Sequence, residues 1–216
     1  MRLRLLVAAC VLSGAPSALA QDWAPAVAKA APGVLRLEAV GQDGSGICSV
    51  VVIDKDRGFA VTCAHCVPFG AGASLAVAKR DVEIMRLNRA LDLAVIRIAK
   101  LHKLADVVNV PVRSTDAPIG TPIAILGYAL GAPTFKAQFG YVAEAVSPLV
   151  AGDALLDAQA FPGDSGGAVI DASGALVSVT AAVVGQLFSP NAYAVGVNAE
   201  AVRIFLEDYL PLAGTK

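Results

Sequence analysis

Short apolar runs rich in β-branched residues, each ending at a turn-forming residue, recur along the whole chain. Val, Ile and Thr favour extended strands, whereas Gly, Pro, Asp and Asn interrupt them. Strands as short and as closely spaced as these are typical of a β-sandwich or a β-barrel. The clearest predicted strands cover residues 34–39, 48–53, 59–62, 93–98, 122–126, 168–170, 176–183 and 192–197.

Two short helices are expected outside these strands. Residues 22–31 can form the first, because Pro32 disfavours a helical conformation beyond them. Asn198 is the expected N-cap of the second, since an Asn side chain accepts a hydrogen bond from the first helical turn. This second helix is predicted over residues 199–210, with an apolar face made of Val202, Phe205, Leu206 and Tyr209.

The first twenty residues have the pattern of a signal peptide. Two arginines precede an apolar run over residues 5–12, and Ala18-Leu19-Ala20 has the small residues that a signal peptidase requires. We therefore expect residues 1–20 to be removed and the mature chain, residues 21–216, to be periplasmic or secreted. Two alternatives are an uncleaved anchor, for which the apolar run is too short, and a lipoprotein signal at Cys10.

Charge and cysteine content limit the partners and the redox setting. Of 17 basic residues two lie in the leader, so with 18 acidic residues the mature chain carries a net charge of −3 and no basic run. Nucleic acid is therefore not an expected partner. Export places Cys48, Cys63 and Cys66 in an oxidising compartment, where at least one pair should be bridged and one thiol left over.

The string Gly163-Asp164-Ser165-Gly166-Gly167 is the strongest motif, and it directly precedes the predicted strand at residues 168–170. Small residues around a serine allow a substrate carbonyl to approach the backbone closely. The N–H groups of Gly163 and Ser165 would then stabilise a developing oxyanion. The alternative is a glycine-rich turn with a solvated Asp and Ser.

A serine hydroxyl needs a base to become a nucleophile, and the chain contains only two histidines. His65 follows a predicted strand and precedes a cysteine, whereas His102 lies between lysines and is expected on the surface. Asp92 begins the apolar strand at residues 93–98, where it can orient the base. The alternative role for Asp92 is that of a turn residue at the start of a strand.

These motifs resemble those of the trypsin-like serine peptidases, in which His, Asp and Ser occur in this order, and the bacterial HtrA-like branch is the most similar. The resemblance covers about residues 25–209. It implies an all-β, chymotrypsin-like fold of two six-stranded antiparallel barrels, over about residues 33–114 and 121–197. It also implies a serine endopeptidase that acts on proteins or peptides through an acyl-enzyme, with no cofactor and no metal. Its catalytic residues would be His65, Asp92 and Ser165.

The sequence departs from the HtrA pattern in two respects. HtrA proteins usually have Asn before the serine and a PDZ domain after the protease, whereas this chain has Asp164 and ends at Lys216, so we expect no PDZ domain in it. Digestive trypsin-like enzymes pair this Asp with a new N-terminus, but no Ile-Val-Gly-Gly-like sequence follows Gln21. The sequence therefore does not identify the group that compensates the charge of Asp164.

The resemblance further implies a disulfide and a specificity pocket. The disulfide joins Cys48 to Cys66 and leaves Cys63 free. The floor of the pocket is expected at Gln159, six residues before the serine, and its wall at Val179, Thr180 and Ala181. Since none of these is charged, we expect cleavage after Ala, Val or Leu and poor cleavage after Lys or Arg.

Two other functions are compatible with the same residues. A trypsin-like fold can persist as a catalytically silent module that binds peptides or partners, although this chain retains every residue expected of the catalytic site. The same residues can also hydrolyse esters or other acyl donors. The sequence leads to no prediction of the oligomeric state.

Overall fold

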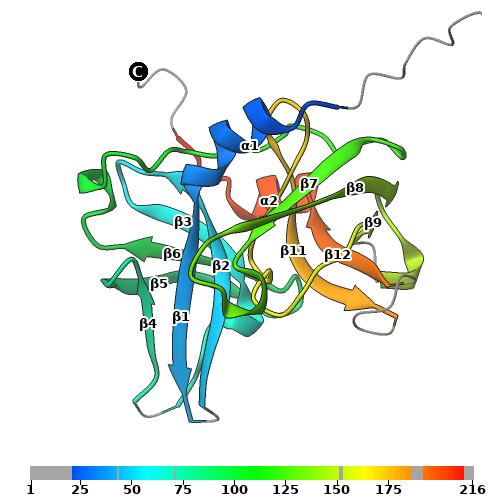
Figure 1. Cartoon of the computed structure of the whole chain (residues 1–216). Helices are drawn as coiled ribbons and strands as arrows, with labels where there is room; N and C mark the ends of the chain where they lie inside the picture. Colours follow the sequence, from blue (N-terminus) through cyan, green and yellow to red (C-terminus); the bar gives the residue numbers. More distant parts are fainter. Residues whose placement is uncertain (1–20, 43, 71, 151–152, 186–191, 212–216) are drawn as a thin grey trace, which may run out of the picture.

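The computed structural model describes residues 21–42, 44–70, 72–150, 153–185 and 192–211, and most of them belong to strands (Figure 1). The leader lies outside the described residues, so the signal peptide stays a prediction. Among the residues described, no helix is long and apolar enough to cross a membrane.

Twelve strands of the described chain form two closed antiparallel barrels with the same strand order. The first barrel is ordered β1-β2-β3-β6-β5-β4, and the second β7-β8-β9-β12-β11-β10. This confirms the expected fold class. The strands are β1 (Val34–Gly41), β2 (Gly44–Asp54), β3 (Phe59–Cys63), β4 (Ser74–Val77), β5 (Arg80–Asn88), β6 (Leu93–Ile98), β7 (Pro122–Gly127), β8 (Lys136–Glu144), β9 (Ala154–Asp157), β10 (Ala168–Ile170), β11 (Leu176–Val184) and β12 (Tyr193–Asn198).

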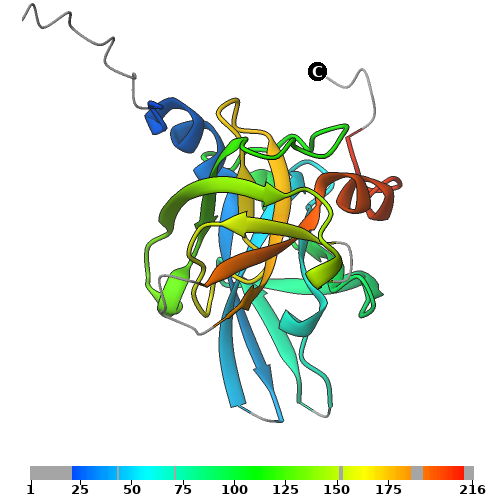
Figure 2. The same cartoon turned by 90° about the vertical axis from the view of Figure 1, so that its right-hand side faces the viewer.

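The expected terminal helices are present and short. The first, α1 (Ala24–Ala30), lies at the opposite end of the first barrel from the β1–β2 hairpin (Figure 2). The second, α2 (Ala199–Phe205), begins at Asn198, whose side chain accepts a 2.9 Å hydrogen bond from the Ala201 N–H. It ends at Phe205 and not at residue 210, because the backbone leaves the helical conformation at Leu206 and continues as turns.

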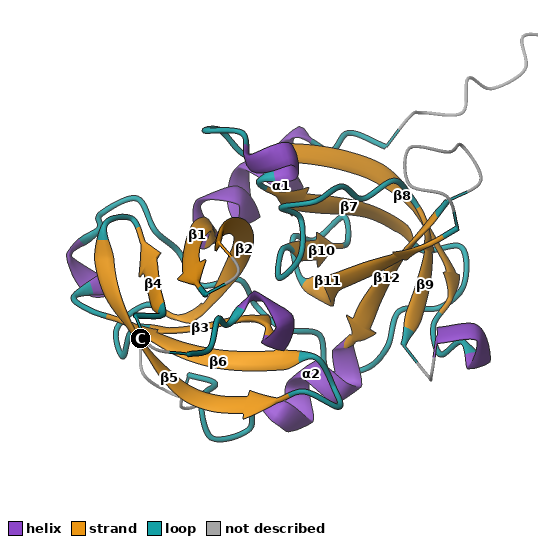
Figure 3. Ribbon diagram, turned by 90° about the horizontal axis from the view of Figure 1, so that it is seen from below, coloured by secondary structure: helices purple, strands orange, loops and turns teal. Residues whose placement is uncertain are grey.

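The two barrels share a hydrophobic core where they meet. One cluster of fully buried residues includes Val50 of β2, Leu126 of β7 and Val179 of β11, so it crosses from one barrel to the other. Figure 3 shows the barrels side by side, with α2 beside the seam between them. Arg86 of β5 donates a 2.9 Å hydrogen bond to the Phe205 carbonyl of α2. This shared core fixes the relative position of the loops at the seam.

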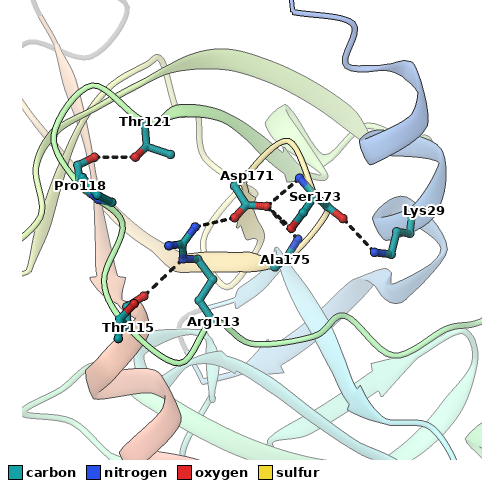
Figure 4. A network of polar contacts seen from close by, with 8 residues as sticks. All are labelled: Lys29, Arg113, Thr115, Pro118, Thr121, Asp171, Ser173 and Ala175. Carbon is teal, nitrogen blue, oxygen red and sulfur yellow. Dashed lines mark hydrogen bonds and ion pairs between the residues drawn. The ribbon is translucent and has the colours of Figure 1, made fainter.

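The connection between the barrels is held by an ion pair (Figure 4). Arg113 lies on this connection and donates a 2.7 Å hydrogen bond to Asp171, in the turn between β10 and β11. The other oxygen of Asp171 accepts hydrogen bonds from Ser173, whose carbonyl accepts one from Lys29 of α1. The linker and α1 are therefore both attached to the second barrel.

Candidate active site

Asp92 makes two hydrogen bonds with His65 and a third with the neighbouring Ala64. His65 lies in the 3₁₀ turn η2 (Ala64–Cys66) that follows β3, and Asp92 lies directly before β6. The Asp92 carboxylate accepts a 2.9 Å hydrogen bond from the His65 backbone N–H and lies 2.7 Å from Nδ1 of the His65 ring. The Asp92 backbone carbonyl accepts a hydrogen bond from the Ala64 N–H. The Asp92 backbone has a φ of 51°, a left-handed conformation that Asp tolerates better than most residues. Asp92 therefore fixes both the turn and the imidazole.

The Asp92 side chain is only partly buried, with 31% of its surface exposed. Burial by itself raises the pKa of Asp92. The hydrogen bonds and the charge of His65 outweigh that effect, so the pKa lies below its ordinary value. The carboxylate is therefore ionised at neutral pH and can stabilise an imidazolium on His65.

The disulfide expected between Cys48 and Cys66 is present and joins β2 to η2, next to His65. Cys63 is a free thiol, as expected. It is buried, and its thiol donates a 3.1 Å hydrogen bond to the Thr180 carbonyl. Burial first, and then the charge of Asp92, raise the pKa of Cys63 well above its ordinary value. Cys63 therefore stays a neutral thiol close to Asp92.

Ser165 lies on the loop between β9 and β10, where this loop meets the first barrel. The neighbouring Gly166 has a φ of 79°, and a Cβ atom there would come within 2.2 Å of the Ser49 carbonyl and of the Thr62 hydroxyl. No larger residue fits between the barrels at this position. The Ser165 carbonyl accepts a 2.8 Å hydrogen bond from the Ser49 N–H, so the first barrel holds the loop that carries the serine.

The two N–H groups expected to form the oxyanion hole are available. Within the described residues, neither the Gly163 N–H nor the Ser165 N–H donates a hydrogen bond. The Pro162 carbonyl accepts from the Leu130 N–H, and in a trans peptide the following N–H points in the opposite direction. The Gly163 N–H is therefore turned away from Leu130. The φ of Gly163 is 102°, and a Cβ there would lie 2.3 Å from the Tyr128 carbonyl.

A pocket of about 220 Å³ adjoins Ser165. Of the four residues expected to shape it, only Thr180 does so. Side chains alternate along a strand, so Val179 and Ala181 of β11 are turned into the core, where both are buried. Gln159 is exposed and outside the lining. The pocket is lined by Ala160, Phe161, Pro162, Ser165, Thr180, Ala182 and Val183.

A second hollow of about 420 Å³ lies beside His65 and the disulfide. Its lining includes Phe69, which is 67% exposed, and Arg89, whose guanidinium lies 5.8 Å from the centre of the Phe69 ring. One hollow is thus lined by the candidate nucleophile and another by the candidate base. Sequence reasoning missed this second hollow, because its lining comes from four separate segments.

Two groups of possible metal ligands adjoin His65. Cys63, His65 and Asp92 place ligand atoms within 4.8 Å of one another, and so do Cys48, His65 and Cys66. In the second group the two sulfur atoms are bonded to each other, so neither is a thiolate. In the first group the His65 Nδ1 is already hydrogen-bonded to Asp92, and Cys63 holds its proton. Both groups are better suited to proton transfer and structural bonding than to holding a cation.

A model of the trypsin-like peptidase domain matches residues 44–179, a segment that contains His65, Asp92 and Ser165. The chain belongs to the trypsin-like peptidase family. No curated protein matches this trypsin-like peptidase in sequence. Solved structures similar to it include HtrA-type proteases, so the resemblance expected from the motifs is confirmed at the level of the fold.

The HtrA-type protease AlgW, solved with a tripeptide, has a TM-score of 0.73 and 22% identity over 86% of this trypsin-like peptidase. The chain spans 63% of the length of AlgW. The Rv3671c protease from M. tuberculosis, in its active form, has a TM-score of 0.70 and 18% identity, with 89% of this chain and 86% of that one covered. A serine endoprotease from Yersinia pestis has a TM-score of 0.72 and 18% identity over 88% of this chain and 67% of that chain.

Proposed function

We propose that the protein is an exported serine endopeptidase that uses Ser165 as nucleophile, His65 as base and Asp92 to orient His65. The observation that carries this proposal is the pair of hydrogen bonds between Asp92 and His65, at a seam where a glycine-rich turn presents Ser165. Family membership supports the same reaction, because the matched domain is a peptidase domain.

In the proposed reaction His65 Nε2 takes the Ser165 hydroxyl proton while Oγ bonds to the scissile carbonyl carbon. The negative charge on the carbonyl oxygen is received by the N–H groups of Gly163 and Ser165, which have no other acceptor in the described chain. His65 then gives its proton to the leaving amine as the carbon–nitrogen bond breaks. Water, activated by the same His65, hydrolyses the acyl-enzyme and restores the Ser165 hydroxyl.

Peptides are the substrate class that the surroundings of Ser165 and His65 support best. A peptide chain has residues on both sides of the scissile bond, and hollows adjoin both Ser165 and His65. Two AlgW structures with this fold hold a tripeptide and a decapeptide, which supports peptide substrates here as well. The Ser165 pocket is small and has no charged lining residue, which favours a small or medium apolar side chain before the cleaved bond.

Export is supported by two features. The first twenty residues have a signal-peptide pattern, and the Cys48–Cys66 disulfide belongs to an oxidising compartment. The N-terminal sequence of protein recovered from the periplasm or the medium tests this, and we expect it to begin at Gln21. Recovery of an intact leader in the cytoplasmic fraction would contradict export.

The activity is tested by treating purified residues 21–216 with a fluorophosphonate and then profiling a peptide library, with Ser165→Ala as the control. We expect labelling and peptide cleavage by the wild type and neither by the variant. Labelling with hydrolysis of esters alone would indicate an acyl hydrolase that does not cleave peptides. A folded protein that is neither labelled nor active would be a catalytically silent module.

A further inference from the structure

Asp164, the residue directly before the candidate nucleophile, is fully buried. A buried carboxylate requires compensation, which a charged partner usually supplies. No ion pair to Asp164 is found among the described residues. Instead, one of its oxygens accepts a 3.0 Å hydrogen bond from the Gln138 side-chain amide and a 2.9 Å hydrogen bond from the Phe161 N–H.

Gln138 is the third residue of β8, where it is paired with Ile125 of β7. The end of β7 closes over the other side of Asp164, because a Cβ atom on Gly127 would lie 2.5 Å from the second carboxylate oxygen. The Asp164 side chain is therefore enclosed by two adjacent strands of the second barrel. The strands fix its position before any substrate binds.

Asp164 separates the two residues whose N–H groups would receive the oxyanion, Gly163 and Ser165. A rotation of the Asp164 backbone would turn one or both of these N–H groups. The carbonyls of Gly163 and Ser165 are held by Ser49 of the first barrel, and the Asp164 side chain is held by Gln138 of the second. The turn is thus held from both sides of the seam.

We propose that Gln138 is a positioning residue, whose amide holds Asp164 so that the Gly163 and Ser165 N–H groups converge on the oxyanion. This inference rests on the proposed function. It assigns to a neutral side chain the role that a charged partner of Asp164 would otherwise have. The oxyanion turn then needs no newly released N-terminus in order to form.

A neutral amide suits Asp164 because this carboxyl group can exist in two protonation states. Burial raises the pKa of Asp164 to about 6, against the opposing effects of its hydrogen bonds and of the Lys136 charge. The Gln138 NH₂ group donates to the ionised carboxylate. The Gln138 Oε1 atom has no hydrogen-bond partner in the described chain, so a flipped amide can accept from the protonated carboxyl. Gln138 can therefore hold Asp164 in either state.

Gln138→Met tests the proposal, because methionine is similar in length and cannot donate a hydrogen bond. Lys136→Met is the matched control, since it removes a charge near Asp164 on the same strand and leaves the Gln138 hydrogen bond in place. We expect Gln138→Met to lower kcat at least about tenfold with little change in KM. Affinity for a peptide aldehyde, which forms an oxyanion on Ser165, should fall by a similar factor, while affinity for a product peptide should not.

Gln138→Lys extends the test, since an ammonium group at this position can pair with ionised Asp164 and should restore much of the lost kcat. Two results would overturn the proposal: a Gln138→Met enzyme whose kcat and aldehyde affinity stay within twofold of the wild type, or an equal loss of aldehyde and product affinity that Gln138→Lys does not restore.

A measurement without turnover separates this proposal from the proposed function. In Ser165→Ala protein, the amide NMR resonances of Gly163 and residue 165 should shift or broaden on Gln138→Met and stay in place on Lys136→Met. Unchanged resonances in both variants would contradict a positioning role. This outcome can be read even if the wild-type protein hydrolyses nothing, because it reports the geometry of the turn alone.

Discussion

The Ser49 hydroxyl of β2 donates a 2.8 Å hydrogen bond to the carbonyl of Gly163, which lies 114 positions later in the other barrel. The same hydroxyl accepts from the Tyr128 N–H at 2.9 Å, and the Ser49 N–H donates to the Ser165 carbonyl. One buried serine thus binds the carbonyls on both sides of Asp164. The first barrel therefore provides more than His65 and Asp92: it also holds the turn that carries the nucleophile.

We predict that Ser49→Ala lowers both the free energy of unfolding and kcat. The change leaves the Gly163 carbonyl and the Tyr128 N–H without their partner, which costs about 1 to 3 kcal/mol for a buried polar group. Ser178→Ala is the control, because the Ser178 hydroxyl is equally buried but has no partner in the described chain. Urea unfolding and steady-state kinetics should show a loss for Ser49→Ala only. Equal losses in both variants would contradict this role of Ser49.

We predict that Asp92→Asn lowers kcat by about 10⁴-fold, because an amide facing Nδ1 favours the wrong imidazole tautomer. The fold should persist, since the amide oxygen can still accept from the His65 N–H. Asp153→Asn is the control, because it removes a nearby negative charge without changing Asp92. Burial first, and then the charge of Asp92, raise the pKa of Asp153, which shows that the two carboxyl groups interact. Steady-state kinetics on an apolar peptide provide the measurement. An Asp92→Asn enzyme within tenfold of the wild type would remove Asp92 from the mechanism.

We predict that replacing both Cys48 and Cys66 by Ala lowers the free energy of unfolding by about 3 kcal/mol, because the disulfide closes a loop across a sequence separation of 18 and restricts the unfolded chain. In the mature wild type, thiol titration should find one group, Cys63, and only after denaturation, since Cys63 is buried. A peptide containing Cys63 in disulfide linkage, found by mass spectrometry, would contradict the pairing.

We predict that the stability of the wild type relative to Asp164→Asn decreases as the pH rises from about 4 to above 6. Burial raises the pKa of Asp164 from 3.8 to about 6, so in this range the folded protein binds the proton more tightly than the unfolded chain. Each pH step upward therefore favours unfolding of the wild type, by a total on the order of 3 kcal/mol, while Asn cannot ionise. Urea midpoints of the two proteins across this range provide the measurement. A constant difference would show that Asp164 is not desolvated.

Sequence patterns failed to predict four strands, β4, β5, β8 and β9, and two of these, β5 and β8, lack a continuous buried apolar face. Along β5 charged residues alternate with apolar ones that remain partly exposed, and β8 exposes Phe139 and Tyr141. Because their apolar residues remain partly exposed, these strands lack the continuous apolar run by which the other strands were recognised. The eight predicted strands have a more continuous apolar character, and all eight are present. The two-barrel architecture itself came from the family resemblance and not from the strand patterns.

The candidate catalytic residues could be named from the sequence because each lies in a local motif. The residues that hold the serine turn in place could not be named in this way. Gln138 lies 26 positions from Asp164 and Ser49 lies 114 positions from Gly163, so neither contact leaves a local pattern. The predicted lining of the specificity pocket differs from the structure for another reason. Counting back six residues from Ser165 selected Gln159, but the loop turns its neighbour Ala160 inward. One position along an extended segment reverses the direction of a side chain.

The last prediction concerns this pocket and compares Ala160→Val with Gln159→Ala. Ala160 is 6% exposed and lines the pocket, so two added methyl groups should narrow it and disfavour Leu relative to Ala before the cleaved bond. A change of one methylene in such a site alters discrimination by about 1 to 3 kcal/mol, so the ratio of kcat/KM for Leu to that for Ala should fall at least about tenfold. Gln159→Ala should leave this ratio unchanged, because Gln159 lies outside the pocket. In both variants cleavage after Lys or Arg should remain poor, since no residue that lines the pocket offers a carboxylate. A peptide-library cleavage profile that changes on Gln159→Ala and not on Ala160→Val would contradict this prediction. It would show that Gln159 forms the floor of the pocket once a substrate is bound.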